Sequence, residues 1–205
     1  MSVAVQIFRL DLSESALARD FAVLDARERA RAEEIRVRAA CKRFIAAHGA
    51  LRITLAAVTG RAPDSLTFMR TPSGKPYLSD AGTPHPLQFS LSTAGGYVAL
   101  AWSYEGEVGI DIEFPRPRVT ADLGAVAAHV LGGGEQRYWR GLASSERIAA
   151  FYRLWTRKEA LAKASGAGFS IPPASIPALE SKTWRGFTVR DLETPRGLVG
   201  ALAAA

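Results

Sequence analysis

Residues 108–114 read VGIDIEF, an apolar run that carries two carboxylates, Asp111 and Glu113. Apolar runs of this length are typical of buried strands, in which an unpaired charge is costly. Side chains two residues apart on a strand point to the same face, so the two carboxylates would project side by side. Ile112 and the other apolar residues would then face the core. The segment therefore predicts a strand whose polar face needs a positive partner.

A divalent cation is one such partner. Mg²⁺ commonly binds two or three carboxylates together with phosphate oxygens and water. The alternative is an edge strand whose outer face is acidic. The short D-x-E pattern does not decide between the two by itself, because it is common in unrelated proteins.

The composition is that of a globular protein with a basic surplus. The 205 residues are 48% hydrophobic and 22% charged, which allows one core or two small lobes. A formal charge of +6 and a pI near 9.8 leave nucleic acid, phosphorylated small molecules and acidic proteins open as partners. A single cysteine, Cys41, excludes an internal disulfide and a cysteine metal cage. The sequence shows neither a membrane-span pattern nor a signal-peptide layout, so we expect a cytoplasmic protein.

The patterning of the first half predicts strand, helix and hairpin in that order. Residues 2–12 alternate like a strand, and residues 25–59 form one long, arginine-rich helical pattern that Gly60 and Pro63 would end. A loop rich in glycine and proline and two strand patterns follow, at residues 71–86 and 87–103.

The second half repeats this order. It shows a strand pattern, two helical patterns and a closing hairpin, at residues 106–114, 120–131, 144–165 and 184–205. The sequence therefore predicts an α+β protein of two similar lobes, residues 1–105 and 106–205.

A polar stripe lies on the second of these helical patterns. Trp155, Glu159 and Lys163 are four residues apart and share one face, with Lys158 beside them. A surface Glu–Lys pair next to a core tryptophan would explain each residue singly. It would not explain why an aromatic anchor and a polar stripe are followed directly by two glycines.

GIDIE (109–113) followed by W-x-x-K-E-A-x-x-K (155–163) resembles the signature of the 4′-phosphopantetheinyl transferases. The match is to the larger, monomeric, two-lobed type that activates nonribosomal peptide and polyketide synthases. SGKPYL (73–78) resembles the G-K-P motif of that family, and FSLST (89–93) resembles its F-x-(I/L)-S-H-(S/T) segment. The resemblance covers about residues 27–170.

The resemblance implies a fold and a reaction. The two lobes would be related by a pseudo-twofold axis, with the active site in the cleft between them. The enzyme would transfer the 4′-phosphopantetheine arm of coenzyme A to a serine hydroxyl of an apo acyl or peptidyl carrier protein. The reaction would need Mg²⁺, with Mn²⁺ as a possible substitute, and would release 3′,5′-ADP. The protein would be a monomer whose partners include neither nucleic acid nor membrane.

The resemblance also assigns roles to residues of the C-terminal half. Asp111, Glu113 and Glu159 would bind the metal ion, and Glu159 would take the serine proton. Lys163 would offset the charge that builds on the pyrophosphate, and Lys158 would lie near the phosphates. Glu135 matches an acidic position of the family, although a helix-capping or solvent-facing role explains it at least as well.

The coenzyme A contacts implied for the N-terminal half are Arg52, Lys75, Pro76, Ser92 and Thr93. Thr93 departs from the family, which has histidine there and is expected to contact the 3′-phosphate with it. Threonine donates a hydrogen bond but carries no positive charge. We therefore expect weaker coenzyme A binding or compensation by a nearby arginine.

Two other functions are compatible with parts of the sequence. The basic helical pattern and the high pI would suit a nucleic-acid-binding module, but this leaves the carboxylates unexplained and lacks interleaved aromatic residues. A carrier-binding protein without catalysis would explain Thr93, but not the joint presence of Asp111, Glu113, Glu159 and Lys163.

Overall fold

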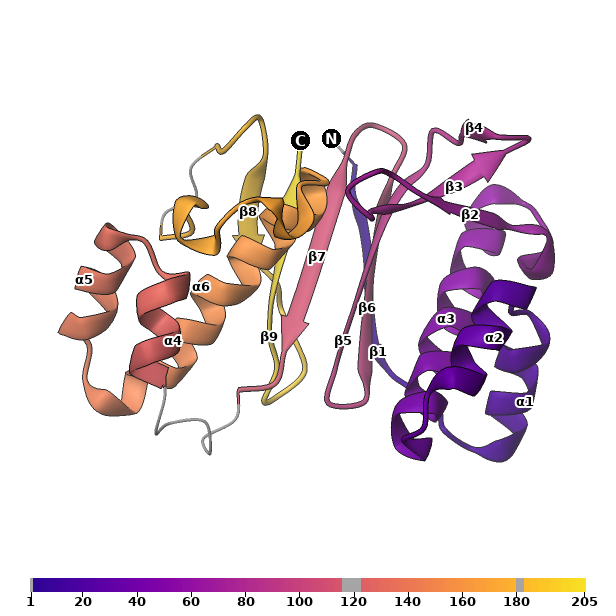
Figure 1. Ribbon diagram of the computed structural model, residues 1–205, viewed down its shortest axis with the longest axis horizontal. Coiled ribbons are helices and arrows are strands. Elements are labelled where there is room, and N and C mark those ends of the chain that lie inside the picture. The colour runs from indigo at the N-terminus through magenta and orange to yellow at the C-terminus, as the bar shows by residue number, and fades with distance from the viewer. Residues whose placement is uncertain (1, 116–122, 180–182) are drawn as a thin grey trace.

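The structure is a computed structural model that describes residues 2–115, 123–179 and 183–205. Within these ranges the chain forms six α-helices and three three-stranded antiparallel sheets (Figure 1). The α+β class predicted from the sequence is confirmed. We refer to residues 2–105 as the N-terminal lobe and to residues 106–205 as the C-terminal lobe. No helix in the described ranges is long and apolar enough to cross a membrane.

The N-terminal lobe packs a long helix against two sheets. Its elements are β1 (Ala4–Arg9), α1 (Glu14–Ala22), α2 (Ala26–Glu34), α3 (Arg38–Thr59), β2 (Thr67–Arg70), β3 (Pro76–Asp80), β4 (Thr83–Pro84), β5 (Gln88–Ala94) and β6 (Tyr97–Ser103). The sheets have the strand orders β1-β6-β5 and β2-β3-β4. Leu51 and Leu55 of α3 are buried with Phe89 and Leu100 of the first sheet, which forms the core of this lobe.

The C-terminal lobe contains β7 (Val108–Glu113), α4 (Leu123–Val130), α5 (Gly133–Gly141), α6 (Ser144–Ala164), β8 (Thr188–Asp191) and β9 (Val199–Ala204). Its sheet has the order β7-β9-β8. In each lobe the first strand pairs with the last, and the last pairs with the strand before it. The two lobes therefore share one topology. Residues 120–122 of the helical pattern predicted at 120–131 lie outside the described residues.

The single helix predicted at residues 25–59 is wrong. Asp25 is the N-cap of α2, and its side chain and that of Glu28 form a reciprocal capping box. Extended backbone at Ile35 and Val37 then ends α2 and begins α3. The chain turns here because Glu28 must lie against α3, where it binds the buried Arg52. The sequence pattern also gave no prediction of α1, which begins at the N-cap Ser13.

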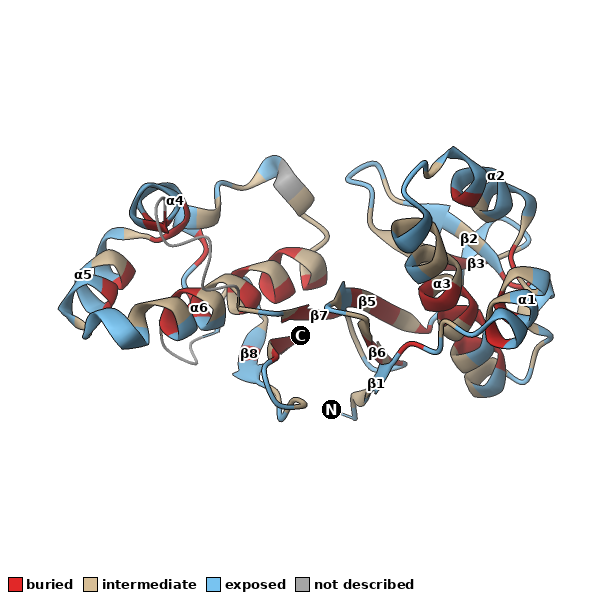
Figure 2. Cartoon of the chain, turned by 90° about the horizontal axis from the view of Figure 1, so that it is seen from below, coloured by how far each residue is buried: buried red, intermediate tan, exposed pale blue. Residues whose placement is uncertain are grey.

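Serine hydroxyls join the two lobes along β5 and β7. The hydroxyl oxygens of Ser90 and Ser92 accept hydrogen bonds from the backbone N–H groups of Ile110 and Ile112, at 3.1 and 3.2 Å. The apolar side of β7 is buried together with β6 and β9 in a core shared by both lobes. Figure 2 shows these buried strands in the middle of the molecule, between the two groups of helices. The sequence predicted that the apolar side chains of VGIDIEF face the core. This is confirmed, because Ile110 and Ile112 are only 0% and 1% exposed.

Gly109 allows α6 to approach β7 closely. A Cβ at this position would lie 2.1 Å from the carbonyl oxygen of Ala160 and 2.4 Å from the amide nitrogen of Ala164. Both atoms belong to the α6 backbone, which cannot move aside as a flexible side chain would. The glycine therefore fixes the distance between the strand that carries Asp111 and the helix that carries Glu159.

We expect Gly109→Ala to lower the free energy of unfolding by roughly 3 kcal/mol, because the methyl group forces the helix and the strand apart. Urea unfolding followed by tryptophan fluorescence measures this change. Gly124→Ala is the matched control, since a Cβ there meets no atom within 4 Å and alanine favours the helix by about 1 kcal/mol. A Gly109→Ala protein as stable as the wild type would contradict the close approach.

Candidate active site

Asp111 lies at the junction of three elements. Its side chain extends from β7, and its Oδ1 accepts hydrogen bonds from Lys163 Nζ of α6 at 2.7 Å and from Ser92 Oγ of β5 at 2.9 Å. Its Oδ2 is buried and has no hydrogen-bond partner in the described part of the chain. Burial raises the pKa of Asp111, and the charge of Lys163 opposes this. One oxygen of the carboxylate is thus satisfied and the other is not.

Glu113 and Glu159 share the electrostatic environment of Asp111. Burial raises the pKa of Glu113, the charge of Asp111 adds to the effect, and a hydrogen bond from Trp155 opposes it. Burial likewise raises the pKa of Glu159, with the charges of Asp111 and Glu113 acting in the same direction and Lys163 against them. The fold therefore brings together the three carboxylates that the sequence suggested, together with Trp155 and Lys163.

The chemistry of these carboxylates fits a hard divalent cation, although the described residues contain no group of three His, Cys, Asp or Glu side chains arranged to hold a metal ion. The pKa values of all three carboxylates are raised, and in the described part of the chain Lys163 is the only cation that forms an ion pair with any of them. The unpartnered Oδ2 of Asp111 is an oxygen ligand of the kind that Mg²⁺ binds.

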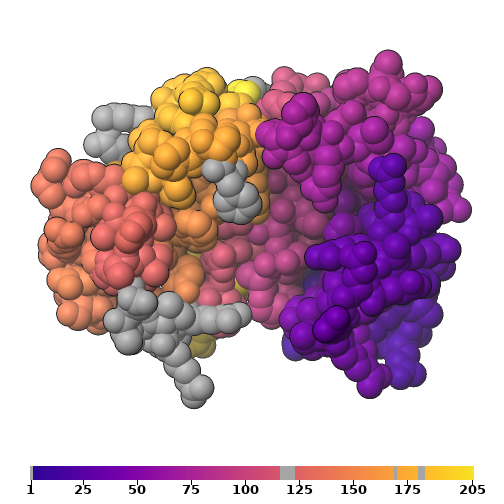
Figure 3. Space-filling view, in the orientation of Figure 1, coloured from indigo at the N-terminus to yellow at the C-terminus, as the bar shows by residue number. Residues whose placement is uncertain are grey.

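A cavity of about 870 Å³ opens beside the carboxylate group. It lies between the lobes, and the space-filling view shows the surface hollowed between the N-terminal helices and the central strands (Figure 3). Its walls are largely apolar, formed by Phe44, Leu51, Phe68, Phe89 and Leu91. Its cationic groups are Arg27, Arg31, Arg70, Lys75 and Lys163. A cavity of this size and charge suits an anionic ligand with an apolar or aromatic part.

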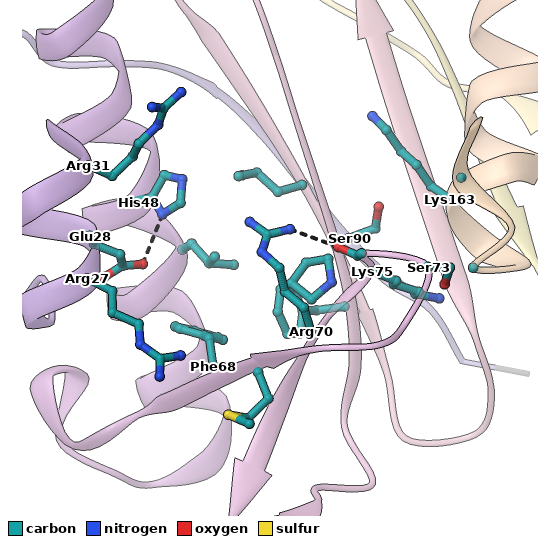
Figure 4. A pocket seen from close by; sticks show the side chains of 18 of the residues that line it. Arg27, Glu28, Arg31, His48, Phe68, Arg70, Ser73, Lys75, Ser90 and Lys163 are labelled. Carbon is teal, nitrogen blue, oxygen red and sulfur yellow. Dashed lines mark hydrogen bonds and ion pairs between the residues drawn. The ribbon is translucent and has the colours of Figure 1, made fainter. Parts of the chain in front are cut away.

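Lys163 and Lys75 approach the cavity from opposite lobes (Figure 4). The ammonium of Lys163 links the cavity to the carboxylate group, because it also binds Asp111 and the carbonyl oxygen of Ile110. Lys75 forms an ion pair with Glu107 and donates to the carbonyl oxygen of Ala164 at 2.9 Å. Pro76 follows Lys75 in the cavity wall. The G-K-P segment thus joins the N-terminal lobe to the C-terminal lobe at one end of the cavity.

Arg52 and Lys158 are placed away from the cavity, inside their lobes. Arg52 is 0% exposed, and its guanidinium donates to Asp25, to Glu28 and to the carbonyl oxygens of Pro63 and Leu66. This differs from the expected contact with coenzyme A. Any effect of Arg52 on a ligand acts through Asp25 and Glu28, which line the cavity.

Lys158 repeats this arrangement in the C-terminal lobe. It is 1% exposed and binds Glu135 at 2.7 Å and the carbonyl oxygens of Pro173 and Ile176. Burial lowers the pKa of Lys158, and Glu135 opposes the shift. Glu135 also accepts the N–H of Gly132 in a capping position, which confirms the capping alternative. In both lobes a cation of the long helix binds the glutamate that caps the helix before it.

Ser92 and Thr93 are adjacent but face different surroundings. Ser92 is buried, and its hydroxyl donates a hydrogen bond to Asp111 and accepts one from the N–H of Ile112. Thr93 is exposed and lines a smaller pocket of about 300 Å³ together with Arg43 and Glu113. An arginine therefore lies where compensation for the missing histidine was expected.

The cavity also contains residues that sequence reasoning did not select. Arg27 and Arg31 are four residues apart in the arginine-rich pattern at residues 25–59 and were given no role there. Their spacing was a usable signal, because it places them on one side of α2. His48 gave no signal, since the carboxylate that it contacts, Glu28, lies 20 residues away in the sequence.

Comparison with known proteins identifies the family of the chain. A family model described as the 4′-phosphopantetheinyl transferase superfamily matches residues 107–199, and a model described as the N-terminal part of 4′-phosphopantetheinyl transferase matches residues 11–105. The 4′-phosphopantetheinyl transferase HetI of Nostoc sp. (strain PCC 7120) is 34% identical over 172 residues, which are 83% of this chain and 72% of HetI.

Two further relatives match shorter parts of this chain. A putative 4′-phosphopantetheinyl transferase of Synechocystis sp. (strain PCC 6803), slr0495, is 34% identical over 73% of this chain and 59% of its own length. AcpT of Salmonella typhi is 46% identical over 45% of this chain and 46% of its own length. The chain belongs to the 4′-phosphopantetheinyl transferase superfamily and is a transferase of this type. The family predicted from the motifs is confirmed.

We expect Glu159→Gln to be more stable than the wild type near pH 7.5 in buffer with a metal chelator. The pKa of Glu159 is raised, so the protonated form stabilises the fold at low pH and that contribution is lost as the pH rises through the folded-state pKa. The amide of the Glu159→Gln variant stays neutral at every pH, so the variant does not lose this stability. The advantage should disappear towards about pH 4, where the wild-type carboxyl is protonated as well.

Urea unfolding at a series of pH values measures this difference. Glu34→Gln serves as the control, because the side chain of Glu34 is 65% exposed on α2. A Glu159→Gln protein that is equally or less stable than the wild type at neutral pH would contradict the conclusion that ionised Glu159 destabilises the fold.

Proposed function

We propose that the protein transfers the 4′-phosphopantetheine arm of coenzyme A to a serine hydroxyl of an apo carrier protein, with Mg²⁺ and with release of 3′,5′-ADP. The observation that carries this proposal is the link between the basic interlobe cavity and the carboxylates: Lys163 lines the cavity and binds Asp111, and the charges of Asp111, Glu113 and Lys163 all act on Glu159. Membership of the superfamily supports the same reaction class.

Coenzyme A would occupy the cavity. The cationic groups that line it suit the phosphates, and the apolar walls suit the adenine ring and the aliphatic arm. Lys75 and Pro76 would contact the nucleotide from one end. Thr93 would contribute a hydroxyl, with Arg43 beside it as the source of charge. Arg52 would position the cavity wall through Asp25 and Glu28 rather than touch the ligand.

Asp111, Glu113 and Glu159 would hold Mg²⁺, and Mn²⁺ would fit the same oxygen ligands. A bound divalent cation supplies charge neutralisation at the pyrophosphate. The lobe junction supports this, because the unpartnered Oδ2 of Asp111 is already fixed in place by the bonds of Oδ1 to Lys163 and Ser92.

Glu159 would accept the proton of the carrier serine. Its raised pKa makes the carboxylate a stronger base than an exposed glutamate. Lys163 would stabilise the negative charge that develops as the bond to the leaving nucleotide breaks, and its bond to Asp111 holds the ammonium at the cavity. Lys158 would act from inside the lobe by fixing α6 against Glu135.

The carrier protein would approach the cavity mouth, where basic groups of the enzyme suit an acidic partner. We propose that the protein acts as a monomer. Coenzyme A and apo carriers are expected together in the cytoplasm, where we propose that the protein acts. Carriers of fatty-acid, polyketide and nonribosomal-peptide synthesis are all candidate substrates.

Incubation with coenzyme A, Mg²⁺ and a panel of apo carriers tests this function, with intact-protein mass as the readout. The wild type should add one phosphopantetheine group to at least one carrier. Glu159→Gln should slow the transfer by about 10²–10⁴-fold, because the proton acceptor is lost, while substitution of the exposed Glu33 of α2, Glu33→Gln, should leave it unchanged. No mass gain on any carrier, alongside a known transferase that modifies the same panel, would contradict the proposal.

A further inference from the structure

His48 of α3 lies in the cavity wall and has no part in the function proposed above. Two contacts fix its orientation. Its ring stacks on Phe44 at a centroid distance of 4.1 Å and an interplanar angle of 29°, and its Nδ1 lies 2.9 Å from Oε1 of Glu28. Figure 4 shows the His48–Glu28 contact at the side of the cavity opposite Lys163. Such a doubly constrained ring presents its remaining nitrogen, Nε2, in a defined direction.

The partners of Glu28 determine which nitrogen of His48 carries hydrogen. Burial raises the pKa of Glu28, but hydrogen bonds from His48 and Arg52 outweigh it, and the net pKa is lower than usual. The carboxylate is therefore ionised and can only accept hydrogen bonds. Nδ1 of His48 must be the donor, which leaves Nε2 for a ligand. A second proton would turn Nε2 into a cationic donor, with the charge stabilised by Glu28.

The other charged groups of the cavity indicate which ligand Nε2 would meet. Two carboxylates, Asp25 and Glu28, line the cavity, and both bind Arg52. The other charged side chains that line it are cations: Arg27 and Arg31 of α2, Arg70 of β2, Lys75 of the following loop and Lys163 of α6. A phosphate bound among these cations would favour a positive charge on His48, so anion binding and protonation of His48 favour each other.

We infer that His48, oriented by Glu28, binds a phosphate group of the nucleotide as an imidazolium, so that coenzyme A binding is accompanied by uptake of a proton. The inference rests on the proposed function, because it takes coenzyme A as the occupant of the cavity. His48 is in this account a binding residue and takes no part in the transfer itself.

Calorimetric titration of the protein with coenzyme A tests the inference without a carrier or a metal ion. Titrations in two buffers of different ionisation enthalpy give the number of protons taken up, at about pH 7 where free histidine side chains are largely neutral. The wild type should take up protons and bind coenzyme A more weakly as the pH rises from about 6 to 8, by up to roughly tenfold.

Three variants isolate the role of His48. His48→Gln keeps a donor for Glu28 but cannot become charged, so its proton uptake should fall and its affinity should vary less with pH. His48→Arg carries a permanent charge and should retain affinity with the same loss of uptake. His129→Gln, an exposed histidine of α4 that binds the carbonyl oxygen of Ala125, should behave like the wild type.

Equal proton uptake by His48→Gln and the wild type would overturn the inference, and so would proton release on binding. Failure of the proposed function is distinguishable from both results. Proton-linked coenzyme A binding without transfer to any carrier would remove the transferase proposal and leave the role of His48 in place. Carrier modification with unchanged uptake in His48→Gln would remove only the role of His48.

Discussion

The arrangement of the site depends on the carboxylate of Asp111, which has one hydrogen-bonded oxygen and one oxygen without a partner among the described residues. One oxygen binds Lys163 of α6 and Ser92 of β5, so a single side chain of β7 ties together three elements from both lobes. The other oxygen is buried without a partner among the described residues. A buried charge costs several kcal/mol unless it is paired and hydrogen-bonded, so the fold holds a group that a cation would stabilise. Gly109 makes this possible, because it lets α6 bring Glu159 and Lys163 against the strand.

The same kind of buried ion pair holds the long helix in place in each of the two lobes. Arg52 and Lys158 are the buried cations of the two long helices, and each binds the capping glutamate of the preceding helix and two backbone carbonyl oxygens near a proline. Removing one partner of such a pair would leave an uncompensated buried charge. Arg52 therefore holds Asp25 and Glu28 of the cavity wall in place, and Lys158 holds α6 against Glu135, although neither cation lines the cavity itself.

The sequence predicted what depends on short spacings. The alternation in VGIDIEF placed Asp111 and Glu113 on one face of a strand, and the spacing of Trp155, Glu159 and Lys163 placed them on one face of a helix. It could not predict the break between α2 and α3, because the contact that the break allows, between Glu28 and Arg52, joins residues 24 positions apart in the sequence. The pairing of His48 with Glu28 escaped notice for the same reason, since it spans 20 residues and two helices. Burial separated Arg52 and Lys158 from the cavity, and motif position alone carries no information on burial.

The central proposal is that Asp111, Glu113 and Glu159 would together bind a divalent cation near the cavity. Electron paramagnetic resonance of Mn²⁺, titrated into the protein with coenzyme A present, counts the bound ions without requiring turnover. The account predicts one Mn²⁺ per chain in the wild type and binding that is at least tenfold weaker in Glu113→Gln, which loses one oxygen ligand but keeps the Asp111–Lys163 contact. Equal Mn²⁺ binding by the two proteins, or none by the wild type, would contradict it.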